Sequence, residues 1–213
     1  MGLVLNNSTV DVNDRESYST YHLARHPELY EVQRTNNFEF IVTDLEGLTK
    51  VGEGVNTSPN FTTDGSLAGS GLGANSNVLR IAVSSSSVPH FSQDALEVKR
   101  GNNTLKYAGT PKFDSHTVKF YDYIGADAKE ILMAWQAKSY NTTTQKVGIA
   151  SDYKKDCYLK EYTPDWQLVR SWILHGCWIG SIQEDEYDSD SNNVKKINCT
   201  INYDWAEIDY SGA

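Results

Sequence analysis

Cysteine is scarce in this chain, and its spacing does not suit a metal site. The three cysteines, Cys157, Cys177 and Cys199, lie 20 and 22 residues apart. No Cys-x-x-Cys pair occurs, so the usual pattern of zinc ligands is absent. All three fall on segments that we expect to be strands. This placement predicts free, buried thiols. A disulfide between two of these strands is left as an alternative.

Long apolar runs and an excess of basic residues are missing as well. No segment is long and apolar enough to cross a bilayer, and the first residues do not read as a signal peptide. We therefore expect synthesis and folding in the cytoplasm. With 213 residues, 39% of them hydrophobic, a single domain with a sizeable core is expected. The net charge of −9 and the lack of a Lys/Arg cluster predict that the protein does not bind DNA tightly.

Residue patterns for catalysis are also lacking. The five histidines are scattered. His22 and His26 have helical spacing, but no Glu lies between them and a proline follows. His175 and Cys177 on one strand would be about 7 Å apart, too far for an easy thiol–imidazole hydrogen bond. The acidic run 185–190 lacks the glycine and final Glu of a calcium loop. We expect no enzyme, no cofactor and no bound metal.

The most informative segment is Gly109–Gln136, which reads as a strand followed by a helix. Apolar and polar residues alternate from Phe113 to Ile124, with His116, Val118 and Phe120 on one face. From Gly125 the period changes to that of a helix, predicted over Ala126–Lys138. The apolar stripe of this helix consists of Ala128, Ile131, Leu132 and Trp135.

Strands dominate the second half of the chain. Cys157–Tyr162 and Gln167–Trp178 are predicted strands on either side of a turn at Thr163-Pro164-Asp165. Glu184–Asn193 is an acidic, solvated connection. The last strand is predicted over Lys195–Trp205.

The last two predicted strands have distinct faces. Trp172 and Trp178 would share a face with Leu174, which favours a packed core or a subunit interface. The core face of the last strand would comprise Ile197, Cys199, Ile201, Tyr203 and Trp205. Its wet face would comprise Lys196, Asn198, Thr200, Asn202 and Asp204.

The first half is more varied. We expect a short helix within Ser17–Tyr30, a strand over Asn37–Leu45 and a Gly-rich loop over Glu46–Asn77. We expect no phosphate site at the glycines of this loop, because the pattern predicts no helix after them and no Lys-Ser/Thr follows. A strand over Val78–Val83 and a hairpin over Ala95–Tyr107, turning at Gly101-Asn102-Asn103, complete this half.

An ordered set of short motifs carries a family resemblance across the second half of the chain. The matching residues are Lys112-Phe113-Asp114, Ala126 to Trp135-Gln136, Tyr153-Lys154-Lys155, Gly176-Cys177-Trp178, Asp190-Ser191-Asn192-Asn193 and Tyr203-Asp204-Trp205. In this order they resemble the tail tube protein of contractile bacteriophages. The same fold recurs in type VI secretion tubes and related contractile injection systems.

This resemblance implies a mainly β protein, an antiparallel β-sandwich or barrel with one short helix packed outside. Residues 1–213 would form a single tail-tube domain, with residues 1–36 as an N-terminal arm and 46–77 as the loop that contacts the neighbouring ring. The residues that would pack the helix are Ile131, Leu132 and Trp135. The predicted loop contacts are Gly52, Asn60, Gly65, Gly69, Gly71 and Gly73. The predicted lumen residues are Asn198, Thr200, Asn202 and Asp204.

The resemblance also implies a function in assembly. Six copies would close into a ring, and stacked rings would form a conduit, polar to negative inside, for DNA after sheath contraction. The implied partners are further copies, the sheath, the baseplate or hub, and the tape measure protein, in a virion tail built in the host cytoplasm. A tube of a type VI secretion or extracellular injection system is an alternative. A more distant one is a carbohydrate-binding β-sandwich that uses Trp166, Trp172 and Trp178.

Overall fold

The computed structural model describes residues 32–45, 74–123, 128–190 and 192–209. The chain divides into a unit Met1–Asn36 and a unit Asn37–Ala213, and every element below belongs to the second unit. None of the helices in these ranges has the length and apolar character that a membrane span requires.

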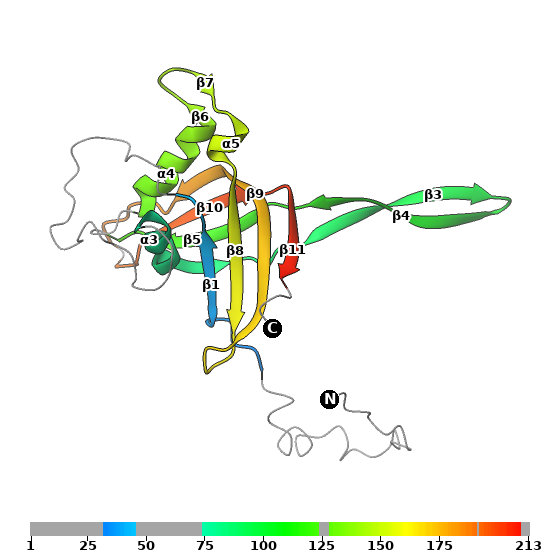
Figure 1. Ribbon diagram of the computed structural model, residues 1–213, viewed down its shortest axis with the longest axis horizontal. Coiled ribbons are helices and arrows are strands. Elements are labelled where there is room, and N and C mark those ends of the chain that lie inside the picture. Colours follow the sequence, from blue (N-terminus) through cyan, green and yellow to red (C-terminus); the bar gives the residue numbers. More distant parts are fainter. Residues whose placement is uncertain (1–31, 46–73, 124–127, 191, 210–213) are drawn as a thin grey trace, which may run out of the picture. The chain divides into compact units, whose positions relative to one another are not determined.

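One layer of the fold is an antiparallel sheet of four strands (Figure 1). Its members are β1 (Phe38–Val42), β8 (Lys155–Tyr162), β9 (Leu168–Glu184) and β11 (Trp205–Asp209), in that order. β8 and β9 form the predicted pair, and the turn that joins them covers Pro164 and Asp165.

The second layer shares the long strand β9. The far half of β9 pairs with β10 (Lys196–Asn202), which pairs with β5 (His116–Tyr121), which pairs with β2 (Val83–Ser86). Phe40 of the first layer stacks on His116 of the second, with ring centroids 5.4 Å apart. The two layers therefore face each other, and the predicted mainly β, antiparallel sandwich is confirmed.

The core lies between the layers and follows the period of two along each strand. The predicted core residues Ile197, Cys199 and Ile201 of β10 are buried, and so are His116, Val118 and Phe120, which were predicted to share one face of β5. All three cysteines are free and buried, as predicted. Burial raises the pKa of the Cys199 thiol to about 12, so this thiol stays protonated and packs as an apolar group.

Within the described residues, α3 (Ala74–Ala82) and α4 (Ala128–Ser139) pack on the sandwich, and α5 (Ala150–Tyr153) packs on α4. The predicted stripe of α4 is buried, with Leu132 and Trp135 almost completely shielded from solvent. The Trp135 Nε1–H donates to the carbonyl oxygen of Tyr153 at 2.7 Å. This bond ties α4 to α5 and satisfies the polar atom of a buried indole.

The hairpin β3 (Phe91–Arg100) and β4 (Asn103–Phe113) extends away from the sandwich (Figure 1). It turns at Gly101, whose φ of 62° lies in the left-handed region. The predicted hairpin is confirmed and is longer than expected at both ends. A second, short hairpin joins β6 (Tyr140–Asn141) and β7 (Lys146–Val147).

Two predicted strands were wrong or too long. Val78–Val83 was predicted as a strand, but most of it belongs to α3, in which Leu79 and Ala82 are buried. α3 also includes residues 74–77, which were predicted as the end of the Gly-rich loop, so a helix does begin directly after Gly73. A short apolar run fits a buried helix as well as a strand, so its periodicity could not decide. The strand predicted from Phe113 is interrupted at residues 114 and 115, where β4 ends and β5 has not begun.

The last predicted strand is two strands. β10 ends at Asn202, and after Tyr203 and Asp204 the chain pairs with the other half of β9 as β11. Tyr203 is buried as predicted, but Trp205 is 44% exposed and stacks on His175. The alternation therefore ends where the strand changes its partner.

Gly176 also breaks an expected pattern. Its φ of 65° bends β9, and the buried positions shift from Leu174 to Cys177 and Ile179. Trp178 therefore does not share a face with Leu174, contrary to the prediction. This bend lets β9 serve both layers of the sandwich.

Candidate assembly surfaces

A polar, solvent-facing side of the second layer is the first candidate surface. Asn198 and Thr200 of β10 lie opposite Lys119 and Thr117 of β5 on one side, and opposite Gln183 and Ser181 of β9 on the other. Residues directly opposite each other in an antiparallel ladder point to the same face. The six side chains therefore form one polar surface, hereafter the polar face, on the reverse of the core.

The polar face differs from the predicted lumen in charge. Lys119 is the ionisable residue among the six, and Lys196, two residues before Asn198 on β10, points to the same side. The Lys196 ammonium lies 5.3 Å from the centre of the Tyr121 ring. No Asp or Glu of the described strands β2, β5 and β10 points to this side. The face is thus polar and weakly basic, whereas the resemblance implied a lumen that is polar to negative.

Asp204 belongs to a different part of the molecule. It lies beyond the end of β10, and its carboxylate accepts hydrogen bonds from the Lys154 ammonium at 2.8 and 2.6 Å. Its backbone N–H donates to the carbonyl oxygen of His175. The alternation along one strand that grouped Asp204 with Asn202 therefore does not hold. The Asp204 carboxylate instead lies against Gly176, at the bend of β9.

The second candidate surface is one side of the β3–β4 hairpin. Leu96 lies opposite Tyr107, and Val98 lies opposite Leu105, so these four side chains point to the same side. All four are exposed, Leu96 by 60%. We call them the hairpin face. The other side carries polar and charged groups, including the ion pair of Lys106 with Glu97.

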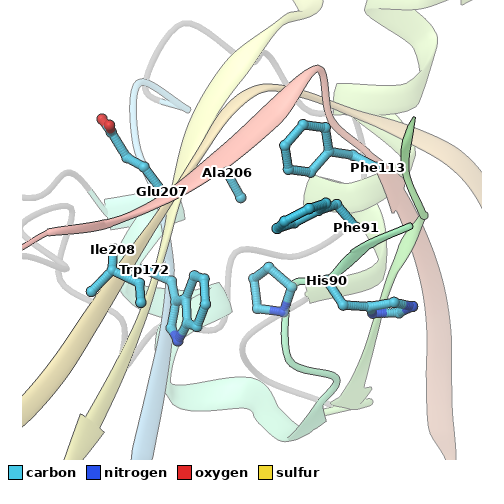
Figure 2. A pocket seen from close by; sticks show the side chains of 8 residues that line it. His90, Phe91, Phe113, Trp172, Ala206, Glu207 and Ile208 are labelled. Atoms are coloured by element: carbon cyan, nitrogen blue, oxygen red, sulfur yellow. The ribbon is translucent and has the colours of Figure 1, made fainter. Parts of the chain in front are cut away.

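An aromatic cavity of about 620 Å³ lies at the base of this hairpin (Figure 2). Its lining is mostly apolar and comes from the hairpin, β9 and β11: Pro89, His90, Phe91, Phe113, Trp172, Ala206, Glu207 and Ile208. Phe91 and Phe113 form the first cross-strand pair of the hairpin, with ring centroids 5.7 Å apart. Phe113 also contacts Tyr203, whose hydroxyl donates to the carbonyl oxygen of His90. These contacts fix the base of the hairpin on the sandwich.

His116 is a buried polar residue that the sequence did not single out. Its Nε2 is 2.8 Å from the Ser86 hydroxyl, and its Nδ1 is 3.1 Å from the Ser87 hydroxyl. Burial, with a smaller contribution from His90, lowers the pKa of His116 to about 4. The imidazole is therefore neutral and shielded from solvent at pH 7. This arrangement fastens the edge strand β2 and does not resemble a catalytic Ser–His pair open to substrate.

Charged groups join α4 to the end of the second layer. The Glu184 carboxylate accepts hydrogen bonds from the Lys129 and Lys195 ammonium groups, both at 2.7 Å. These bonds lower the pKa of Glu184 and raise that of Lys195. The Lys195 ammonium also lies 2.6 Å from the Tyr187 hydroxyl. Lys195 thus holds part of the acidic connection after β9 in place through Glu184 and Tyr187.

Several predicted sites fall outside the described ranges or are dispersed. Outside them lie the helix expected within Ser17–Tyr30 and the loop residues Gly52, Asn60, Gly65, Gly69, Gly71 and Gly73. In the ranges that the structure covers, no group of three or more His, Cys, Asp or Glu side chains is arranged to hold a metal ion. The three tryptophans proposed as a sugar platform have different neighbours. Trp166 lies beside Tyr162, Trp178 lies beside Tyr153, and Trp172 lines the cavity.

Comparison with known proteins finds similarity in structure and not in sequence. No protein-family model matches the chain, and no curated protein matches it. A chain of the PVC sheath–tube complex, an extracellular contractile injection system in its extended state, superposes with a TM-score of 0.57 at 16% identity. The match covers 90% of this chain and 97% of that one.

Two further solved structures agree with this match. The sheath/tube terminator of the PVC system gives a TM-score of 0.56 at 19% identity, over 84% of this chain and 97% of that one. The tube-terminating cap of the anti-feeding prophage gives 0.57 at 15% identity, over 84% and 92%. The chain therefore has the fold of components of contractile injection systems, consistent with the predicted tail-tube fold.

Proposed function

We propose that this chain is a structural subunit of the tube of a contractile machine. The observation that carries the proposal is the match to the PVC sheath–tube complex, which extends over nearly the whole of both chains. In the proposed assembly six copies close into a ring, and rings stack into a hollow tube. The tube acts mechanically, as a rigid channel driven forward when a surrounding sheath contracts.

The polar face provides a suitable wall for such a channel. Asn198, Thr200 and Asn202 point away from the core on a sheet surface with few charges. Trp178 lies opposite Asn202 and Tyr121 lies opposite Lys196, so aromatic rings border these polar groups. A polyanion such as DNA passing along it would meet amide and hydroxyl groups, which make weak, sequence-independent contacts with phosphates. Lys119 and Lys196 would add a modest attraction, which salt would screen. DNA would therefore pass without being held by sequence-specific contacts.

The proposed partners follow from the same assembly. They are further copies of this chain, a sheath, a baseplate or hub and a tape measure protein, in the tail of a virion assembled in the host cytoplasm. A second candidate is the tube of an extracellular contractile injection system. The similar structures come from such systems, and this observation favours the second candidate.

Negative-stain electron microscopy of the concentrated protein tests the proposal, with light scattering to follow its mass. We expect six-fold rings or hollow filaments that grow in number with concentration. A mass that stays monomeric over the whole concentration range, with no rings on the grid, would contradict self-assembly. Adding a purified baseplate or sheath fraction to the same sample then tests templated assembly separately.

A further inference from the structure

The hairpin face and the aromatic cavity are both open to solvent in a single copy. We propose that they are the two halves of one head-to-tail contact, in which the hairpin of one copy lies across the cavity of the next. This inference rests on the proposed function, because it names the contact that joins the subunits.

The hairpin is poorly suited to stand alone. Two-stranded hairpins are marginally stable in water unless one side packs on other protein. Here the side formed by Leu96, Val98, Leu105 and Tyr107 consists of apolar and aromatic groups only, and each is at least 38% exposed. A contiguous exposed patch of this kind marks an interaction site.

The chain's own cavity cannot receive its own hairpin face. Phe91 and Phe113 at the base line the cavity, whereas the hairpin face begins beyond the register shift between Gln93 and Ala95. From that point the strands run away from the sandwich to the turn at Gly101 (Figure 1). Within the described residues the hairpin face stays exposed, and we infer that a second molecule covers it.

A second copy fits both the shape and the charge of the hairpin. The cavity of about 620 Å³ has room for several apolar side chains, and its walls include Phe113, Trp172 and Ile208 (Figure 2). Because Phe91 and Phe113 of the host copy belong to its own hairpin, an incoming hairpin would continue the same apolar strip. This continuity favours another copy of the chain over an unrelated partner.

Charges around the two surfaces are complementary. The outer part of the hairpin carries Lys99, Arg100 and Lys106 against a single carboxylate, Glu97. The lining of the cavity includes the carboxylate Glu207 and no Lys or Arg. Glu207 lies 3.2 Å from the His175 imidazole, and Asp114, next to the lining residue Phe113, lies 3.2 Å from the His90 imidazole. Opposite charges on the two patches orient the incoming hairpin and disfavour the reversed arrangement.

Such a contact joins two different patches of identical chains. Contacts of this type are heterologous, and repetition closes them into a ring or extends them into a filament. Both results agree with a tube built from many copies. The hairpin–cavity contact thus gives the proposed assembly a defined pair of surfaces.

A double-mutant cycle on assembly tests the inference. Leu105→Asp places a charge on the hairpin face, and Ile208→Asp places one in the cavity. We expect each substitution to raise the protein concentration needed for assembly by about tenfold or more, because the contact loses a buried apolar group. The double variant should be little worse than either single variant, because both remove the same contact. Thr104→Asp is the matched control, since Thr104 neighbours Leu105 but points to the other side.

The outcomes separate this inference from the proposed function. If the unsubstituted protein forms tubes and Leu105→Asp forms them at the same concentration, the hairpin contact is wrong and the tube function stands. If the unsubstituted protein never assembles, both fail. Should Ile208→Asp prove unfolded by thermal melting, a mixture of Leu105→Cys and Glu207→Cys treated with a short bis-maleimide replaces it. Linked dimers that appear only on mixing support the contact, and their absence from assembled tubes contradicts it.

Discussion

His116 illustrates how a single buried residue couples the fold to pH. Its neutral ring bridges Ser86 at the end of the edge strand β2 and Ser87 directly after it, and stacks on Phe40 across the core. The pKa falls from 6.5 to about 4 in the fold. Below pH 6.5 the unfolded chain therefore binds a proton that the folded chain rejects, and the folded state loses stability as the pH drops towards 4.

We predict that the free energy of unfolding falls by roughly 3 kcal/mol between pH 7 and pH 4 because of this group. Urea unfolding of the wild type and of His116→Asn across this range measures it, and the variant should lack this part of the pH dependence. His90→Gln should keep most of this pH dependence, since His90 makes only the smaller contribution to the lowered pKa of His116. If the free energy of unfolding changed with pH equally in the wild type and in His116→Asn, the role given to His116 would be wrong.

Gly176 is the residue that allows β9 to bend. It has a φ of 65°, and an added Cβ would collide with the Asp204 carboxylate. Gly101 has nearly the same φ but open space around it. We therefore predict that Gly176→Ala destabilises the protein by about 2 kcal/mol or more and Gly101→Ala by about 1 kcal/mol. Thermal unfolding of the two variants compares them, and equal losses would show that the contact with Asp204 is unimportant.

At the scale of elements, α4 is the helix whose buried stripe the sequence identified. Leu132 has no exposed surface, and Met133 on the same helix is 44% exposed. Leu132→Ala should cost about 2–5 kcal/mol of unfolding free energy, because it leaves a cavity in the core. Met133→Ala should change it by less than about 1 kcal/mol. Chemical denaturation of both variants decides whether α4 is part of the cooperative core.

Elements with a strong period were predictable, and changes of partner were not. The alternation in β5 and β10, the stripe of α4 and the turn at Gly101 are local signals, and the structure confirms them. The strand predicted over Val78–Val83 failed because a short apolar run suits either element. The break after Asn202 depends on long-range pairing with β9, which no local pattern records.

The candidate surfaces show the same division. Alternation along β10 was enough to identify Asn198 and Thr200 as solvent-facing, and the structure places them on the polar face. The weakly basic character of that face comes from Lys119, which belongs to a strand about 80 positions earlier and becomes a neighbour only through pairing. The hairpin was predicted from its sequence. The exposure of its apolar side was not, because it depends on the hairpin extending away from the sandwich.

At the scale of the whole molecule, the Gly-rich segment remains the proposed contact between rings. We predict that removing Gly65–Gly73 leaves the fold intact, because α3 begins only at Ala74. Stacking of rings should then be lost while single rings persist. Thermal unfolding and electron microscopy of this variant check the two parts, and tubes of normal length would contradict the role of the loop.

In the proposed assembly, copies of this chain build a hollow tube whose inner wall is the polar face. A cryo-electron microscopy reconstruction of the assembled protein shows which surface faces the channel. We predict six subunits in each ring, with Asn198, Thr200 and Lys119 facing the channel and the hairpin of each copy lying on its neighbour. A closed, solid particle, or a tube with the polar face buried between subunits or turned outward, would contradict the account.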